Sequence, residues 1–153
     1  MKLLVICGGG GKTSLTKKYP DLFLDIDEFV WSSHNTKYHK ELLEAISIED
    51  INTIKNIYKS IMVNNRNYLQ TQSKIILGHN QIYSDWIGVE LLAELKPSIT
   101  LHEINIESRT PELKIIAKQN WKDLSNAIIY DNWESFYKII SKYTGYELYY
   151  DIK

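Results

Sequence analysis

The chain has 153 residues, a length that suits one domain, and 44% of them are hydrophobic, which is enough to fill one core. Its formal net charge of −1 gives no general attraction for nucleic acid or for an anionic membrane, so such contacts would have to be local. A single cysteine excludes an internal disulfide framework, and no apolar run is long enough to span a bilayer, so we expect a cytoplasmic protein.

Short apolar runs alternate with longer periodic segments along the chain, which predicts β–α units around a mainly parallel sheet. The first half predicts strands at 2–7, 22–26 and 74–78, with helices at 13–19, at about 37–46 and from 51 onward. The second half predicts a helix at 82–95, a strand at 99–104, a charged helix at 111–121, a strand at 127–130 and a helix at 133–143. These elements predict one three-layer α/β domain over residues 1–153, with a five-stranded sheet flanked by helices.

A glycine run fills residues 8–11, between the first predicted strand and the first predicted helix, and Lys12 and Thr13 follow it directly. A glycine loop in this position lets backbone N–H groups surround the phosphates of a nucleotide. In the phosphate-binding loop pattern, however, the position of the first glycine is here occupied by Ile6. Either Ile6 takes that place or the loop is shorter than usual, and both alternatives stay open at this stage.

Two carboxylates, Asp25 and Asp27, close the second predicted strand. Alternation along a strand would send both to one face and Ile26 to the other. Ligands of open α/β sheets bind at the carboxyl ends of the strands, the edge at which the glycine run must also lie. The pair is therefore predicted to hold Mg²⁺ through water and to orient or deprotonate an attacking hydroxyl, the alternative being a solvated strand end.

With these motifs the chain resembles the P-loop small-molecule kinases, the nucleoside, nucleotide and shikimate kinase-like group. The resemblance is carried by the glycine loop with Lys12 and Thr13, by Phe-Leu-Asp-Ile-Asp at 23–27, and by the segment at 128–136. It implies a P-loop NTPase-type fold, with ATP and Mg²⁺ as cofactors and a mobile lid at 106–122. The residues that it implies for ATP are Gly8, Gly9, Gly10, Gly11, Lys12, Thr13, Ser14 and Asn132.

The resemblance also implies roles in transfer. Lys12 would bridge the β- and γ-phosphates, and Arg109 would stabilise charge on the transferring group. Thr13 and Asp25 would serve the metal ion, and Asp27 would act as base on the acceptor hydroxyl. The residues predicted to contact the acceptor are Asp27, Arg66, His79 and Asn80.

The sequence thus predicts an ATP- and Mg²⁺-dependent phosphotransferase that moves the γ-phosphoryl group to a small acceptor, a nucleoside or nucleotide. One alternative is a polynucleotide 5′-hydroxyl kinase, against which the near-neutral charge counts. A second is a catalytically inactive nucleotide-binding regulatory module, motivated by Ile6 and by Gly78-His79-Asn80, where an acidic residue would be expected. The expected partners are a nucleoside triphosphate and a small molecule, and not a membrane; nucleic acid and a homodimer stay open.

Overall fold

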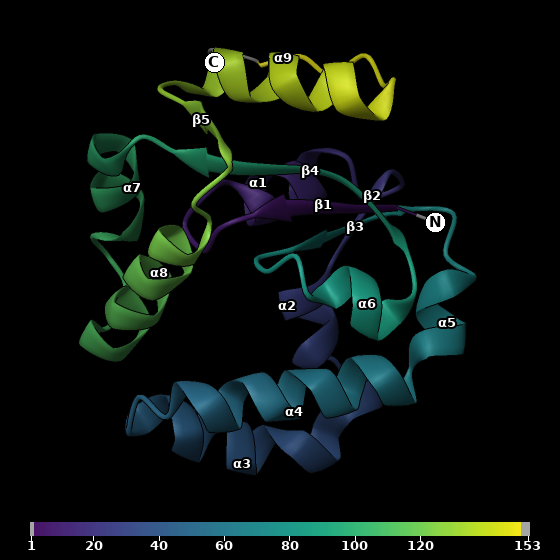
Figure 1. Ribbon diagram of the computed structural model, residues 1–153, viewed down its shortest axis with the longest axis vertical. Helices are drawn as coiled ribbons and strands as arrows, with labels where there is room; N and C mark the ends of the chain where they lie inside the picture. The colour runs from purple at the N-terminus through teal and green to yellow at the C-terminus, as the bar shows by residue number, and fades with distance from the viewer. Residues whose placement is uncertain (1, 151–153) are drawn as a thin grey trace.

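The computed structural model describes residues 2–150, whose five parallel strands form a single sheet in the order β2-β3-β1-β4-β5 (Figure 1). The strands are β1 (Lys2–Ile6), β2 (Phe23–Asp25), β3 (Ile75–Gly78), β4 (Glu90–Pro97) and β5 (Ile128–Tyr130). The α/β class and a five-stranded sheet flanked by helices are confirmed, although one of the five predicted strands was misplaced, and the sheet is parallel throughout rather than mainly so.

Helices cover both faces of this sheet, which gives the predicted three layers (Figure 1). The helices are α1 (Lys12–Lys18), α2 (Ile26–Val30), α3 (Thr36–Ser47), α4 (Ile51–Asn64), α5 (Arg66–Gln70), α6 (Tyr83–Ile87), α7 (Ile99–Ile106), α8 (Pro111–Asp123) and α9 (Trp133–Thr144), with a 3₁₀ turn η1 at Ser33–Asn35. α1 and α9 pack on one face, whereas α2 to α6 pack on the other. α7 and α8 lie beyond the arrowheads of β1 and β4, at the carboxyl edge of the sheet.

Each face of the sheet has its own core because side chains alternate along the central strand β1. Leu3 and Val5 pack against α2, α4 and α6, while Leu4 and Ile6 pack against α1 and α9. All four side chains are fully buried. A continuous apolar run is what a strand covered on both faces requires, and that is why β1 was recognised from sequence.

The prediction was wrong in the stretch 82–106. The expected helix at 82–95 is only the short α6 followed by β4, and the expected strand at 99–104 is the helix α7. Leucine, alanine and glutamate in β4 favour helix, but β1 and β5 pair with this segment on its two sides and override that preference.

Two local signals mark the true boundaries of this stretch. Gly88 ends α6 in the left-handed conformation, at φ 77°, as glycine does after many helices. Ser98 begins α7, because its side chain accepts a hydrogen bond from the N–H of Leu101 at 3.3 Å. Pro97 directly before this cap ends the strand.

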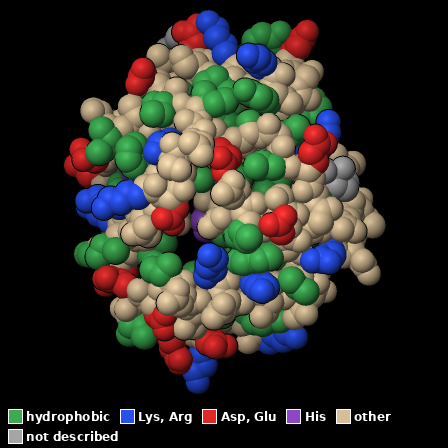
Figure 2. Space-filling view, in the orientation of Figure 1, with side chains coloured by type: hydrophobic (Ala, Val, Ile, Leu, Met, Phe, Trp, Pro, Cys, Tyr) green, Lys and Arg blue, Asp and Glu red, His purple; other side chains and the backbone are tan. Residues whose placement is uncertain are grey.

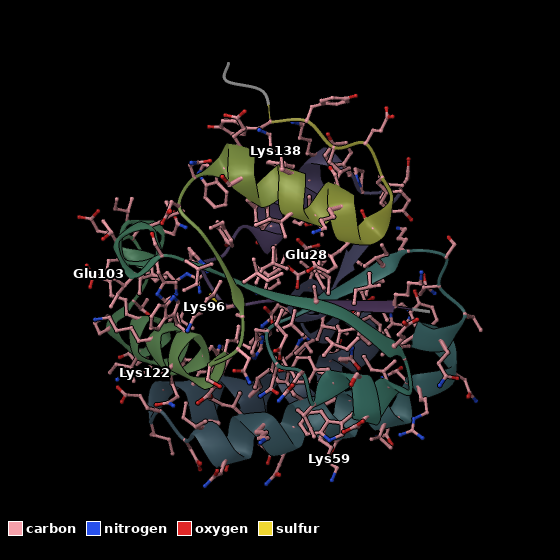
Figure 3. The ribbon with its side chains drawn as sticks, turned by 45° about the horizontal axis from the view of Figure 1, so that its top comes forward. Glu28, Lys59, Lys96, Glu103, Lys122 and Lys138 are labelled. Atoms are coloured by element: carbon pink, nitrogen blue, oxygen red, sulfur yellow. The ribbon has the colours of Figure 1, made fainter. Side chains whose placement is uncertain are left out.

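Charge is well mixed on the face shown in Figure 2, where acidic and basic side chains alternate and no large basic area appears. Among the labelled side chains of Figure 3, Lys96 lies between the sheet and α8, whereas Lys59 and Lys138 lie at the periphery. Lys96 is 7% exposed and its ammonium lies 3.8 Å from the centre of the Trp121 ring. None of the helices within residues 2–150 has the length and apolar character needed to cross a bilayer.

Candidate active site at the glycine loop

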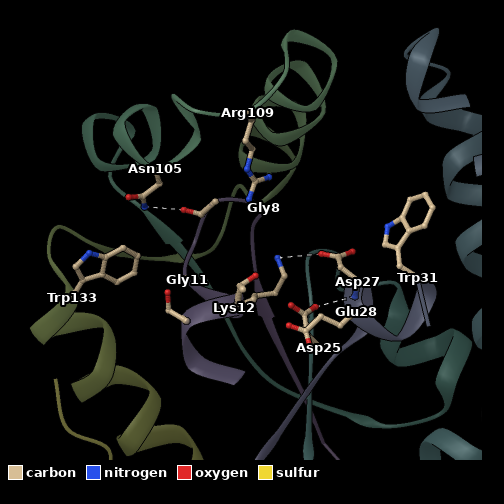
Figure 4. A pocket seen from close by; sticks show the side chains of 13 residues that line it. Gly8, Gly11, Lys12, Asp25, Asp27, Glu28, Trp31, Asn105, Arg109 and Trp133 are labelled. Carbon is tan, nitrogen blue, oxygen red and sulfur yellow. Dashed lines mark hydrogen bonds and ion pairs between the residues drawn. The ribbon is translucent and has the colours of Figure 1, made fainter. Parts of the chain in front are cut away.

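A cavity of about 560 Å³ opens at the carboxyl edge of the sheet, next to the glycine loop (Figure 4). Three parts of the chain form it: the loop with the start of α1, the end of β2 with α2, and the segment around α7, together with the first residue of α9. The lining residues are Gly8, Gly9, Gly11, Lys12, Thr13, Ser14, Asp25, Asp27, Glu28, Trp31, Asn105, Arg109 and Trp133. The structure thus brings together the glycine loop, both aspartates and Arg109.

The loop itself is short, which decides between the two alternatives for Ile6. Ile6 is the last residue of β1 and is fully buried, so the loop spans residues 7–11 between β1 and α1. A β-carbon at Gly10 would lie 2.5 Å from Cγ2 of Ile6, which shows how closely the loop packs on this side chain. Ile6 is therefore part of the floor beneath the loop.

Side chains from α7 and β5 bind three successive carbonyl groups of the loop. Nε2 of His102 lies 2.7 Å from the Gly8 carbonyl oxygen, and the Asn105 amide donates to that of Gly9 at 2.8 Å. The Tyr130 hydroxyl donates to the Gly10 carbonyl. Burial lowers the pKa of His102, so its ring is neutral and carries its proton on Nε2 when it donates to the carbonyl.

These contacts decide where the loop N–H groups point. In a planar trans peptide the N–H and the preceding C=O point in opposite directions. The carbonyls of Gly8 and Gly10 are held toward His102 and Tyr130, so the N–H groups of Gly9 and Gly11 point the other way, and both glycines line the cavity. Such paired N–H groups make a concavity that suits anions.

Glycine is required in the loop for two reasons. Gly9 and Gly11 have φ values of 81° and 103°, in the left-handed region where other residues are strained. Crowding adds to this, because a β-carbon would lie 2.5 Å from Ile106 at Gly9 and 2.7 Å from Trp133 at Gly11.

Lys12 is the first residue of α1, and its side chain reaches toward Asp27. It is 6% exposed, and its ammonium donates to the Ile6 carbonyl at 3.1 Å. The same ammonium lies 3.7 Å from Oδ2 of Asp27. Lys12 is thus held beside the loop between a carbonyl and a carboxylate.

Asp25 and Asp27 both face the cavity, but for another reason than strand alternation. β2 ends at Asp25, and Asp27 belongs to α2, so the predicted strand to 26 was one residue too long. Asp25 caps this helix, since its Oδ1 accepts a hydrogen bond from the N–H of Asp27 at 2.9 Å. The Asx cap turns the chain and brings the two carboxylates to one place.

The two carboxyl groups have opposite electrostatic environments. Burial, together with the negative charge of Asp27, raises the pKa of Asp25 to about 7. Desolvation also acts against ionisation of Asp27, but the charge and hydrogen bond of His79, followed by Lys12 and Tyr58, outweigh it and hold the pKa of Asp27 well below its usual range. Near neutral pH, Asp27 is therefore ionised while Asp25 is close to its midpoint.

A set of rings fixes the orientation of Asp27. The Tyr58 hydroxyl of α4 donates to Oδ1 at 2.7 Å, and Nδ1 of His79 lies 3.4 Å from the same oxygen. On its other side, Nε2 of His79 lies 2.8 Å from the hydroxyl of Tyr83. His79 was predicted to contact the phosphoryl acceptor, but it does not line the cavity and instead contacts the Asp27 side chain.

Other predicted residues lie elsewhere. Asn80 binds the N–H of Ile82, and Arg66 donates to the carbonyl of Trp86, so both hold α6 and neither lines the cavity. Asn132 also lies outside the lining and caps α9 through the N–H of Ser135.

Arg109 lies where a lid residue was expected, in the connection between α7 and α8, and Nη1 would be 3.5 Å from a β-carbon at Gly8. It is exposed, and no carboxylate within residues 2–150 forms an ion pair with it. The mobility of 106–122 stays a prediction.

Sequence reasoning missed several residues of this region: His102, Asn105, Glu28, Trp31, Tyr58 and Tyr130. The first two were hidden by the wrong strand at 99–104. The Ser98 cap after Pro97 was the signal that would have placed them on one helix face, three positions apart. Glu28 and Trp31 follow Asp27 on α2, and nothing in the sequence marks them.

The oxygen donors at the cavity suit a hard divalent cation. Mg²⁺ takes one or two protein ligands and completes its shell with water and substrate phosphates, so the Thr13 hydroxyl and the Asp25 carboxylate fit it. In the described part of the chain, no group of three or more His, Cys, Asp and Glu side chains is arranged to hold a metal. No protein-family model, curated protein or solved structure matches the chain.

Proposed function

We propose that this protein is an ATP- and Mg²⁺-dependent phosphotransferase that moves the γ-phosphoryl group to a small acceptor of the nucleoside or nucleotide class. The observation that carries the proposal is the position of Lys12, whose ammonium lies between the carbonyl of Ile6, at the end of β1, and the carboxylate of Asp27. A cation between an anion-binding loop and a carboxylate can stabilise the negative charge of a phosphoryl group during its transfer from the triphosphate at the loop to an acceptor at Asp27.

The loop supports the triphosphate half of the proposal. N–H groups of Gly9 and Gly11 face away from the bound carbonyls, and the N-terminus of α1 adds a positive dipole. Lys12 would leave the Ile6 carbonyl for the β- and γ-phosphates, and Arg109, which has no ion-pair partner in the described chain, would approach the same group. Trp133, half-buried beside Gly11, would face the nucleotide.

The metal would be served by the hydroxyl of Thr13 and, through water, by Asp25, and when bound it would neutralise charge on the phosphates. Asp25 is half ionised at its raised pKa of about 7 and mostly ionised above it, and a nearby cation would favour the ionised form further.

Asp27 would orient the acceptor hydroxyl. Because its pKa lies well below the usual range, it is a weak base but a reliable ionised hydrogen-bond acceptor. Phosphoryl transfer through a loose transition state requires mainly that the acceptor hydroxyl is correctly positioned. Tyr58 and His79 hold the Asp27 carboxylate in the orientation needed to position it.

The experiment is a γ-phosphoryl transfer assay combined with ATP binding for Lys12→Ala and Asp27→Asn. We expect Lys12→Ala to abolish turnover and to weaken ATP binding. Asp27→Asn should keep ATP affinity within about threefold, since it removes no contact to the triphosphate, and lose transfer by about a hundredfold or more. Normal turnover by Asp27→Asn would disprove its role, and tight ATP binding without transfer by the unaltered protein would favour a regulatory module.

A further inference from the structure

The end of the cavity formed by α2 and its cap is acidic. Asp25, Asp27 and Glu28 line it together. The cations that line the same cavity are Lys12 and Arg109. Arg109 lies next to Gly8, and the Lys12 ammonium lies between the Ile6 carbonyl and Asp27, where the triphosphate would engage it. An acceptor that carries a phosphate would therefore meet carboxylates and find no lining cation beyond those that the triphosphate needs.

An aromatic platform stands at this acidic end. Trp31 follows α2, is 38% exposed, and lines the cavity on the side opposite Trp133, with Lys12 between the two in Figure 4. The ring of His39 supports Trp31 from α3, with the ring centres 5.1 Å apart. His39 is itself fixed, because its Nε2 lies 2.9 Å from the Val30 carbonyl. Trp31 is thus held in place with indole surface left open at the rim.

We propose that the acceptor is an uncharged nucleoside whose base stacks on Trp31 and whose hydroxyl reaches Asp27, and that phosphorylated acceptors are rejected by the acidic wall. The inference rests on the proposed function and narrows it. Trp31 and Glu28 are then specificity-determining residues: the indole supplies a flat apolar surface, and the carboxylate accepts hydrogen bonds from neutral groups while it repels phosphate.

In the reaction, the acceptor oxygen forms a bond to the γ-phosphorus as the bond from that phosphorus to the β-γ bridging oxygen breaks. ADP leaves with the electrons of the broken bond, and the proton of the acceptor hydroxyl passes to solvent from the hydrogen bond with Asp27. The product is a nucleoside monophosphate, which gains the charge that the acidic wall disfavours, so product release is assisted.

The test compares three acceptors at equal concentration with ATP and Mg²⁺: a nucleoside, its 5′-monophosphate, and a short 5′-hydroxyl oligonucleotide. The four common bases are each tried, and ATP binding is measured separately. We expect kcat/KM for at least one nucleoside to exceed that for its monophosphate and for the oligonucleotide by about tenfold or more. Preferred transfer to the monophosphate or the oligonucleotide would overturn this inference and leave the phosphotransferase intact. Bound ATP with no transfer to any acceptor would overturn both.

Variants of Trp31 and Glu28 test whether these two residues determine the acceptor specificity. Trp31→Ala should raise KM for the nucleoside about tenfold, the size of a lost base–aromatic stack, with ATP affinity unchanged, and Trp31→Phe should restore most of it. Tyr143→Ala is the matched control, because Tyr143 is 37% exposed on α9 and does not line the cavity. Glu28→Gln should improve use of the monophosphate relative to the nucleoside by about fivefold or more. An unchanged KM in Trp31→Ala, or unchanged discrimination in Glu28→Gln, would contradict the assigned roles.

Discussion

Asp25→Asn should stabilise the protein in the absence of nucleotide and metal. The carboxyl is 3% exposed, and burial with the charge of Asp27 raises its pKa from 3.8 to about 7. An acid whose pKa is raised by folding holds a proton that the unfolded chain has already lost. Its contribution to stability therefore declines as pH rises between these two values, and the loss is complete above about pH 7.

The size of the stability loss follows from the difference between the two pKa values of Asp25, 3.8 and about 7. Each pH unit corresponds to about 1.4 kcal/mol, so ionised Asp25 costs the folded state up to about 4 kcal/mol. Because Asp27 is coupled to it, this figure belongs to the pair and is an upper value. Asparagine removes the charge and keeps the oxygen that accepts the N–H of Asp27, and it is an equally good helix cap.

Urea unfolding of both proteins at pH 5 and pH 8 measures the effect. We expect Asp25→Asn to raise the free energy of unfolding by about 2–4 kcal/mol at pH 8 and by clearly less at pH 5. The matched control is Asp50→Asn, at another helix cap, where hydrogen bonds from the Thr53 side chain and N–H lower the pKa. Because the pKa of Asp50 lies below its usual value, its carboxylate is ionised at pH 5 and at pH 8, so that variant should lose the same stability at both pH values. Equal effects of Asp25→Asn at both pH values, or destabilisation at pH 8, would refute the reasoning.

Two further predictions concern the glycine loop. Asn105→Ala removes the hydrogen bond to the Gly9 carbonyl, and we expect this variant to bind ATP about threefold to tenfold more weakly than the unaltered protein. Asn56→Ala, on the exposed side of α4, is the control, and equal ATP affinities of the Asn105→Ala variant and the unaltered protein would contradict a role of this hydrogen bond in shaping the loop. Gly10→Ala places a β-carbon 2.5 Å from Cγ2 of Ile6, so ATP affinity should fall by more than about tenfold while circular dichroism shows that the protein is folded. Unchanged ATP affinity would mean that the loop can shift to accept the methyl group and still bind ATP.

What the sequence predicted well was set by local signals. The apolar run of β1, the glycine loop and the short helix after it are adjacent in the chain, so their relation is local and survives in the structure. The Asp25 and Asp27 pair was also found, although a helix cap and not a strand face brings the two carboxylates together. Because Asp25 and Asp27 are only two positions apart in the sequence, a strand face and a helix cap both bring their carboxylates close together.

What the sequence could not predict depends on pairing between distant segments. β4 is rich in leucine and glutamate, and its strand conformation comes from its place between β1 and β5. Tyr58 and His79, which fix Asp27, come from α4 and from the end of β3, and only the folded chain shows that they meet. The same holds for Trp31, whose position depends on a ring from α3.

The segment after Pro97 shows why one wrong element hid the most informative contacts of the loop. Residues separated by three lie on opposite faces of a strand but on the same face of a helix. Had the predicted strand at 99–104 continued to Asn105, it would have turned the side chains of His102 and Asn105 to opposite faces. As α7 it presents both to the carbonyls of Gly8 and Gly9, which are also neighbours in the chain. With the Gly10 carbonyl bound by Tyr130 of β5, the N–H groups of Gly9 and Gly11 point away from the bound carbonyls of Gly8 and Gly10. The orientation of the Gly9 and Gly11 N–H groups thus depends on side chains from α7 and β5, two segments far from the loop in the sequence.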